Sequence, residues 1–258
     1  MRTIFAMGGG GFTMEPENPA LDDYILSLSG KPVPKLLFLP TASGDPNEHI
    51  HKFMSAFGHK MCEPDHLSLF RLGSNPVDLE EHLFAQDIIY VGGGSMRNLL
   101  AIWRVHELDR ILLECWERGV VLAGLSAGAM CWMEWGVTKS GGRPEPCEGM
   151  GLLPGSLTVH YDGEADRRPV YLQGVADGTL PAGYAADDGV GLLFREREFV
   201  TAVSSRPGGR AFHVERRDGE AVEEPLDVTY LGGVQPANPR ASDDVREFRA
   251  TRYRAMGR

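Results

Sequence analysis

The chain has 258 residues and a formal net charge of −10 at pH 7, and 42% of its residues are hydrophobic while 24% are charged. This composition is typical of a compact globular protein and excludes a chain that is largely disordered. The negative charge argues against a nucleic-acid partner, because phosphate binding needs clustered Lys and Arg, and the Arg-rich end from Arg240 to Arg258 also carries acids.

Short apolar runs bounded by Gly or Pro predict buried strands at Thr3–Met7, Leu36–Leu39, Ile88–Val91 and Val120–Leu122. Helical patterns lie between them, and the clearest one, Val105–Glu117, places its apolar residues on one face. This alternation predicts an α/β fold, a three-layer sandwich in which helices cover both faces of a parallel sheet and ligands bind at the carboxyl ends of the strands. After residue 183, turn signals separate further short strands at Gly191–Phe194, Phe199–Val203, Phe212–Arg216 and Val228–Leu231, which predict a short antiparallel extension.

We expect a single α/β domain over residues 1–235, followed by a charged tail or helix at 236–258. The N-terminus reads as a first strand rather than a signal peptide, and no run approaches the roughly 18 apolar residues that a membrane span requires. The four cysteines show neither a CxxC motif nor Cys/His ligand spacing, so we expect no disulfide framework and no metal site. These features favour a cytoplasmic protein.

Two glycine-rich segments follow predicted strands. Gly8–Gly11 departs from the GxGxxG dinucleotide motif because Thr13 occupies the third glycine position, and it is interpreted as a tight turn. The second segment, Gly92-Gly93-Gly94-Ser95, precedes a helical pattern, and such a turn exposes backbone N–H groups that suit an oxyanion or a phosphate. No Lys follows it as in a P-loop.

The third glycine-rich segment, Gly124-Leu125-Ser126-Ala127-Gly128, carries the most information. A buried strand precedes this Gly-x-Ser-x-Gly motif and a helix start follows it, which is the context of a nucleophile elbow. The two glycines are needed because the serine occupies a sharp turn where neighbouring Cβ atoms would collide with the crossing backbone. We therefore predict that Ser126 is the nucleophile of a serine hydrolase.

A serine hydroxyl needs a general base held by a carboxylate. Of the eight histidines, His160 is the best candidate, because it ends the predicted strand Leu157-Thr158-Val159 at a loop edge. Asp188 is the favoured carboxylate because it lies in the Asp-Asp-Gly turn before Gly191, and its neighbour Asp187 remains an alternative. Asp162 and Glu164 are alternatives close to His160 in sequence, but a carboxylate two to four residues away on an extended segment rarely faces Nδ1.

These residues resemble peptidase E, the aspartyl dipeptidase family related to cyanophycinase, over roughly residues 1–235. The resemblance lies in Gly92–Ser95, in Gly124–Ala129, and in Gly151–Gly155 leading to His160-Tyr161-Asp162. It implies a fold of the class I glutamine amidotransferase-like (flavodoxin-like) type, no cofactor, a cytoplasmic location and a short peptide substrate cleaved at its N-terminal residue, and it is compatible with a homodimer. It also implies that Ser126 is the nucleophile, that His160 is the base, and that the Gly94 and Ala127 amides form the oxyanion hole.

Aspartyl dipeptidases carry Glu where this chain has Asp188, so we expect a peptidase that is less strict for N-terminal Asp. Glu134, Asp162 and Glu164 are candidates to bind a substrate α-ammonium group. A serine esterase or amidase that acts on small non-peptide acyl compounds would use the same residues, and a non-catalytic binding protein on this fold is a further alternative.

Overall fold

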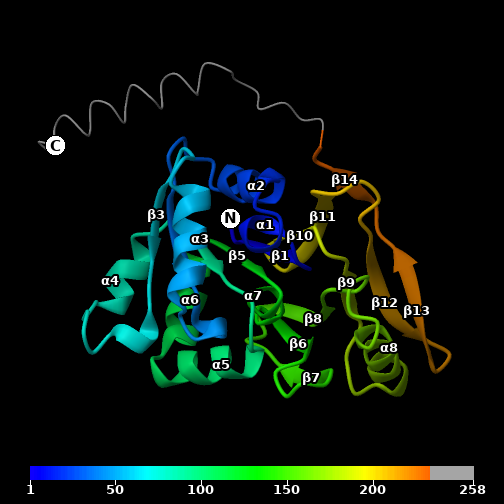
Figure 1. Ribbon diagram of the computed structural model, residues 1–258. Helices are drawn as coiled ribbons and strands as arrows, with labels where there is room; N and C mark the ends of the chain where they lie inside the picture. The colour runs from blue at the N-terminus through cyan, green and yellow to red at the C-terminus, as the bar shows by residue number, and fades with distance from the viewer. Residues whose placement is uncertain (233–258) are drawn as a thin grey trace, which may run out of the picture.

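The computed structural model describes residues 1–232, and the predicted tail at 236–258 lies outside the described residues. Its main sheet has eight strands in the order β14-β11-β10-β1-β5-β4-β2-β3 (Figure 1). The five strands from β1 to β3 in this order are parallel to one another, and β10 and β11 are added in antiparallel fashion. The strands of this sheet are β1 Thr3–Met7, β2 Lys35–Leu39, β3 Glu63–His66, β4 Ile88–Val91, β5 Val121–Leu125, β10 Val190–Arg195, β11 Glu198–Ser204 and β14 Val228–Tyr230.

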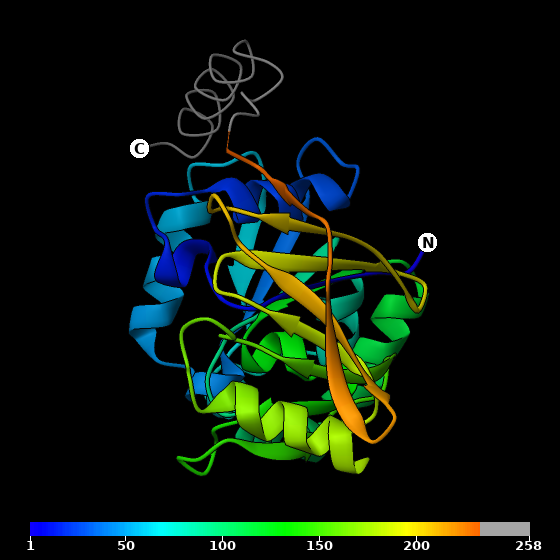
Figure 2. The ribbon, with the colours of Figure 1, turned by 90° about the vertical axis from the view of Figure 1, so that its right-hand side faces the viewer.

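A second sheet of six strands, in the order β13-β12-β9-β8-β6-β7, packs beside the first. The sequence did not indicate this sheet, and the predicted antiparallel extension is divided between the two sheets: β10 and β11 join the main sheet, whereas β12 and β13 join the second (Figure 2). The strands of the second sheet are β6 Met133–Thr138, β7 Glu145–Glu148, β8 Leu153–Thr158, β9 Gly183–Ala186, β12 Ala211–Arg217 and β13 Glu220–Pro225.

Helices cover both faces of the main sheet. On one face α1, α2 and α3 pack through Phe12, Ile25 and Phe53, whereas α5 and α6 pack on the other through Trp103 and Trp116. Central strands bury side chains on both faces, which explains why they read as continuous apolar runs. The helices are α1 Gly11–Met14, α2 Ala20–Leu28, α3 Asn47–Phe57, α4 Leu79–Phe84, α5 Met96–Val105, α6 Leu108–Glu117, α7 Ala127–Met130 and α8 Arg167–Asp177, with short 3₁₀ turns at Thr41–Ser43 and Leu69–Arg71.

The predicted α/β sandwich and its strands in the first half of the chain are confirmed. The predicted helix Val105–Glu117 is wrong at its start, because Val105 is the last residue of α5 and is 76% exposed, and α6 begins at Leu108. Glu107 between them has a φ of 55°, and this left-handed conformation interrupts the helical hydrogen bonds. None of the helices in residues 1–232 is long and apolar enough to cross a membrane.

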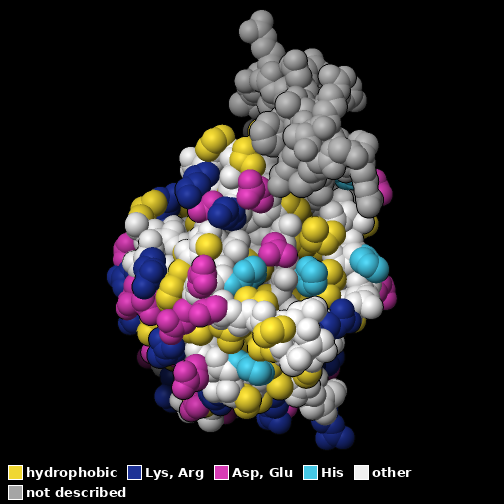
Figure 3. Space-filling view, turned by 90° about the vertical axis from the view of Figure 1, so that its left-hand side faces the viewer, with side chains coloured by type: hydrophobic (Ala, Val, Ile, Leu, Met, Phe, Trp, Pro, Cys, Tyr) yellow, Lys and Arg dark blue, Asp and Glu magenta, His cyan; other side chains and the backbone are white. Residues whose placement is uncertain are grey.

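Acidic and basic side chains are interspersed over the face shown in Figure 3. Among the described residues visible on that face they do not gather into one continuous basic surface. This distribution agrees with the expectation drawn from the net charge, and the absence of a nucleic-acid partner stays a prediction.

One carboxyl group is buried in the core beside the Gly8–Gly11 turn. Asp22 in α2 is 2% exposed, and its Oδ1 atom has no hydrogen-bond partner among the described residues. Burial raises the pKa of Asp22 to about 7, although Lys60 and the Phe12 N–H act in the opposite direction. The folded protein therefore holds a proton that the unfolded chain releases near pH 3.8.

This shift predicts that the free energy of unfolding falls as the pH rises from about 4 to about 7, because in this window only the folded state keeps the proton. Asp22→Asn should remove this loss, which is on the order of up to 4 kcal/mol. Urea unfolding at several pH values measures the effect. Asp218→Asn, in the exposed turn between β12 and β13, is the matched control and should keep the wild-type pH dependence. An unchanged profile in Asp22→Asn would contradict the assignment.

Candidate active site

Ser126, His160 and Asp188 form one chain of hydrogen bonds. The Ser126 Oγ atom lies 2.9 Å from His160 Nε2, and His160 Nδ1 lies 2.6 Å from Asp188 Oδ1. Ser126 is 8% exposed, so the hydroxyl lies in a site largely shielded from water. The structure thus brings together the three residues for which the sequence predicted catalytic roles.

The turn at Ser126 has the strained geometry that the Gly-x-Ser-x-Gly pattern predicts. Ser126 has a φ of 53° between β5 and α7, and its N–H donates to Met7 O at the end of β1 (3.0 Å). A Cβ atom on Gly124 would lie 2.1 Å from Gly128 O, and one on Gly128 would lie 2.3 Å from Val91 O. Only glycine fits at these two positions, and the crossing backbone then holds Ser126 in a conformation that non-glycine residues rarely adopt.

The Gly92–Ser95 turn runs beside the serine. A Cβ atom on Gly93 would lie 3.3 Å from Ser126 Cβ, and Gly94, with a φ of 141°, packs so closely on Ala42 that a Cβ atom would lie 2.3 Å from its carbonyl oxygen. The backbone N–H groups of Gly94 and Ala127 have no hydrogen-bond partner within residues 1–232. Both amides are therefore available to an incoming acceptor.

His160 and Asp188 are held by the first glycine-rich turn, which the sequence showed only as a tight turn. Gly8 O accepts the His160 N–H at 3.3 Å, and Gly9 O accepts the Gly189 N–H at 3.1 Å. A Cβ atom on Gly9 would lie 2.1 Å from Asp188 Oδ1 and 3.1 Å from His160 Nδ1. Absence of a side chain at Gly9 is what lets the carboxylate reach the imidazole.

The neighbouring Asp187 has a different environment. Its carboxylate receives a hydrogen bond from Arg210 Nε at 3.0 Å, and burial raises its pKa although Arg210 opposes the shift. The geometry therefore favours Asp188 over Asp187 as the partner of His160.

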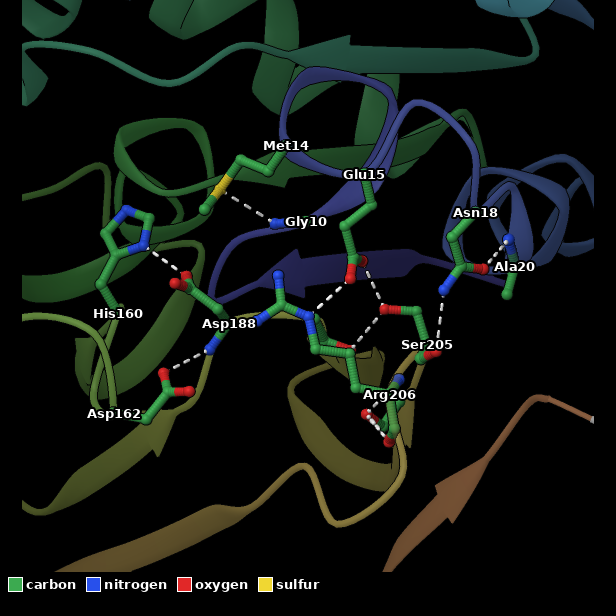
Figure 4. A network of polar contacts seen from close by, with 12 residues as sticks. Gly10, Met14, Glu15, Asn18, Ala20, His160, Asp162, Asp188, Ser205 and Arg206 are labelled. Carbon is green, nitrogen blue, oxygen red and sulfur yellow. Dashed lines mark hydrogen bonds and ion pairs between the residues drawn. The ribbon is translucent and has the colours of Figure 1, made fainter.

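The three candidates for α-ammonium binding already have partners. Asp162 accepts the Asp188 N–H at 2.8 Å (Figure 4), and Glu134 accepts the Gly155 N–H at 2.9 Å. Glu164 pairs with Arg167 and Lys139, and although burial acts against it, these two cations lower its pKa. Within the described residues, no side-chain hydrogen bond or ion pair joins Glu134 or Glu164 to the Ser126–His160–Asp188 chain, although the Glu164 N–H donates to His160 O at 2.9 Å.

The sequence analysis missed an ion pair beside Asp188, between Glu15 and Arg206 (Figure 4). These residues are distant in sequence and neither lies in a motif, so no local signal could have identified them. Residues 1–232 contain no group of three or more His, Cys, Asp or Glu side chains placed to hold a metal ion.

Comparison with known proteins identifies the family. The model of peptidase family S51 matches residues 4–202. The chain belongs to this family. It is 50% identical to an uncharacterized peptidase, YgaJ, of Bacillus subtilis (strain 168) over 232 residues, which cover 90% of this chain and 100% of that protein. The chain is therefore a serine-type peptidase, and the predicted peptidase E-like family is confirmed.

Two solved structures share the S51 chain's fold. A peptidase from an acI-B1 Actinobacterium superposes with a TM-score of 0.69 at 19% identity, covering 88% of this chain and 95% of that one. A putative peptidase E protein from Listeria monocytogenes EGD-e superposes with a TM-score of 0.57 at 17% identity, covering 78% of this chain and 97% of that one.

Gly9→Ala should displace the Asp188 carboxylate and break its hydrogen bond to His160. We expect the rate of Ser126 modification by a fluorophosphonate to fall by about 10²-fold, as small displacements of reacting groups do. Labelling followed by intact mass measures this rate. Gly73→Ala is the matched control, because Gly73 has no atom within 4 Å of its Cβ position. Equal labelling rates in both variants would contradict this role of Gly9.

Proposed function

We propose that this S51 peptidase hydrolyses dipeptides or short peptides at the N-terminal residue through an acyl-enzyme intermediate. The observation that carries the proposal is the hydrogen-bonded chain from Ser126 Oγ through His160 to Asp188. A hydroxyl is a weak nucleophile at neutral pH, and an imidazole within hydrogen-bond distance can accept its proton during attack.

In the first half of the reaction, Ser126 Oγ attacks the scissile carbonyl carbon while His160 Nε2 takes the hydroxyl proton. Asp188 accepts the Nδ1–H hydrogen bond, which fixes the tautomer and stabilises the imidazolium that forms. The tetrahedral oxyanion would accept hydrogen bonds from the Gly94 and Ala127 amides, which have no partner in the described part of the chain. The intermediate collapses when His160 returns the proton to the leaving amine.

In the second half, a water molecule takes the place of the leaving amine. His160 accepts a proton from this water as its oxygen attacks the acyl-enzyme, and the proton then passes to Ser126 Oγ when the acid product leaves. No cofactor is needed, because both steps use only these side chains and water.

The proposed substrate class follows from the family and from the low exposure of Ser126. Ser126 is 8% exposed, and a site of this kind suits small substrates better than a folded protein chain. We propose that the preference for the N-terminal residue is broader than Asp, because Asp188 stands where aspartyl dipeptidases carry Glu. Of the three candidates for the substrate α-ammonium, we favour Asp162, since its carboxylate binds the Asp188 backbone N–H.

Ser126→Ala should lower kcat by about 10⁶-fold while leaving the fold intact, because the acyl-enzyme can no longer form. The measurement is fluorophosphonate labelling with intact mass and peptide mapping, together with turnover of dipeptides, aminoacyl amides, their N-acetylated forms and acyl esters. We expect stoichiometric labelling at Ser126 and hydrolysis only where the α-amine is free.

Ser74→Ala, in an exposed turn, is the matched control and should behave as wild type. Equal turnover of N-acetylated substrates or preference for acyl esters would indicate an esterase or amidase instead. Absence of labelling and turnover in the folded wild-type protein would overturn the proposal in favour of a binding role.

A further inference from the structure

A network of polar contacts near Asp188 joins two segments that are far apart in the sequence. Arg206 Nε donates to Glu15 Oε1 at 2.5 Å, and Ser205 Oγ donates to Glu15 Oε2 at the same distance. Asn18 Nδ2 donates to Ser205 O at 2.9 Å, so the segment after α1 is tied to the turn after β11 (Figure 4). Glu15 is held from two sides, and it fixes the position of the Arg206 guanidinium.

This network packs on the same turns that position the proposed acid. The Arg206 side chain crosses Gly189, the residue after Asp188, where a Cβ atom would lie 3.0 Å from Arg206 Cγ and Cδ. A Cβ atom on Gly10 would lie 2.8 Å from Glu15 Oε2, and Gly10 follows the glycine that makes room for Asp188. Figure 4 shows the guanidinium between Glu15 and Asp188.

The guanidinium lies among three carboxylates. Its hydrogen bond to Glu15 raises the pKa of Arg206, and the charges of Asp188 and Asp162 act in the same direction, so Arg206 stays cationic. Of the guanidinium nitrogens, only Nε has a hydrogen-bond partner within the described residues, and this partner is Glu15. A cation beside several carboxylates offsets part of their negative charge.

Other charged groups around His160 have cationic partners of their own. Glu164 faces the imidazole but pairs with Arg167 and Lys139, and Asp187 pairs with Arg210. Asp162 and Asp188 form no ion pair with Lys or Arg within residues 1–232, and Arg206 is a cation whose charge interacts with both.

We infer that Arg206, restrained by Glu15, is a positioning residue whose cationic side chain packs on the Asp188–Gly189 turn and offsets the negative charge around the His160–Asp188 pair. The inference rests on the proposed function, in which Asp188 supports His160 as the base. Arg206 does not touch the reacting atoms, and it acts through the charge that it holds next to Asp188.

The test is the midpoint of the His160 imidazole titration, followed by NMR in the full-length protein and assigned with His160→Gln. A unit charge on the order of 7 Å away moves such a midpoint by about half a pH unit in a medium whose dielectric constant is close to that of water. Arg206→Gln removes a cation and should raise the midpoint by about this amount, because imidazolium is then less disfavoured. The acid limb of kcat/KM should move to higher pH by the same amount.

Glu15→Gln removes an anion and should move the midpoint to lower pH, whereas Arg206→Lys keeps the charge and should stay near wild type. Arg217→Gln, in the β12–β13 hairpin where Arg217 pairs with Glu215 and Glu224, is the matched control and should leave the midpoint unchanged. A charge effect shifts the midpoint in opposite directions in Arg206→Gln and Glu15→Gln. Structural damage would shift the midpoint equally in Arg206→Gln and Arg206→Lys.

A shift of the same sign in Arg206→Gln and Glu15→Gln, or no shift in either, would overturn the inference. The NMR midpoint does not depend on turnover, so it is read even if the wild-type protein hydrolyses no peptide. In that case the proposed function fails while the electrostatic role of Arg206 is still decided.

Discussion

Around Ser126 the backbone segments that follow β1, β4 and β5 approach one another too closely for side chains, and this constraint governs the site. Gly124 and Gly128 face carbonyl oxygens at distances that a Cβ atom cannot occupy, and Gly9 leaves the space that the Asp188 carboxylate fills. Close packing of bare backbone makes the turn rigid, since a shift of one segment would require the others to move. The strained φ of Ser126 is maintained by this packing rather than by local preference.

Local sequence patterns were sufficient to predict the three residues that the structure brings together, but not the residues around them. Ser126 lies in a motif whose glycines have a steric reason, and His160 and Asp188 follow strands that end at the same edge of the fold. Glu15 and Arg206 could not be predicted in this way, because their pairing depends on how two segments far apart in the chain are folded together.

The errors in the predicted elements have a similar origin. Edge strands β3 and β7 contain charged residues and Pro, as edge strands often do, and they lack the continuous apolar runs from which the central strands were predicted. The residues around His106 are compatible with a helix, so the break before α6 is set by the packing of α5 against α6 rather than by composition.

The candidate site is built from both sheets, so its geometry depends on how the two sheets pack together. Ser126 follows β5 of the main sheet, and His160 follows β8 of the second sheet. Asp188 lies on the connection from β9 in the second sheet to β10 in the main sheet, so it belongs to the junction between them. The hydrogen bonds of the His160 imidazole therefore form only when the two sheets are correctly positioned relative to each other. The Gly8–Gly11 turn fixes this relative position, because it follows β1 in the main sheet and accepts hydrogen bonds from the backbone of both His160 and Gly189.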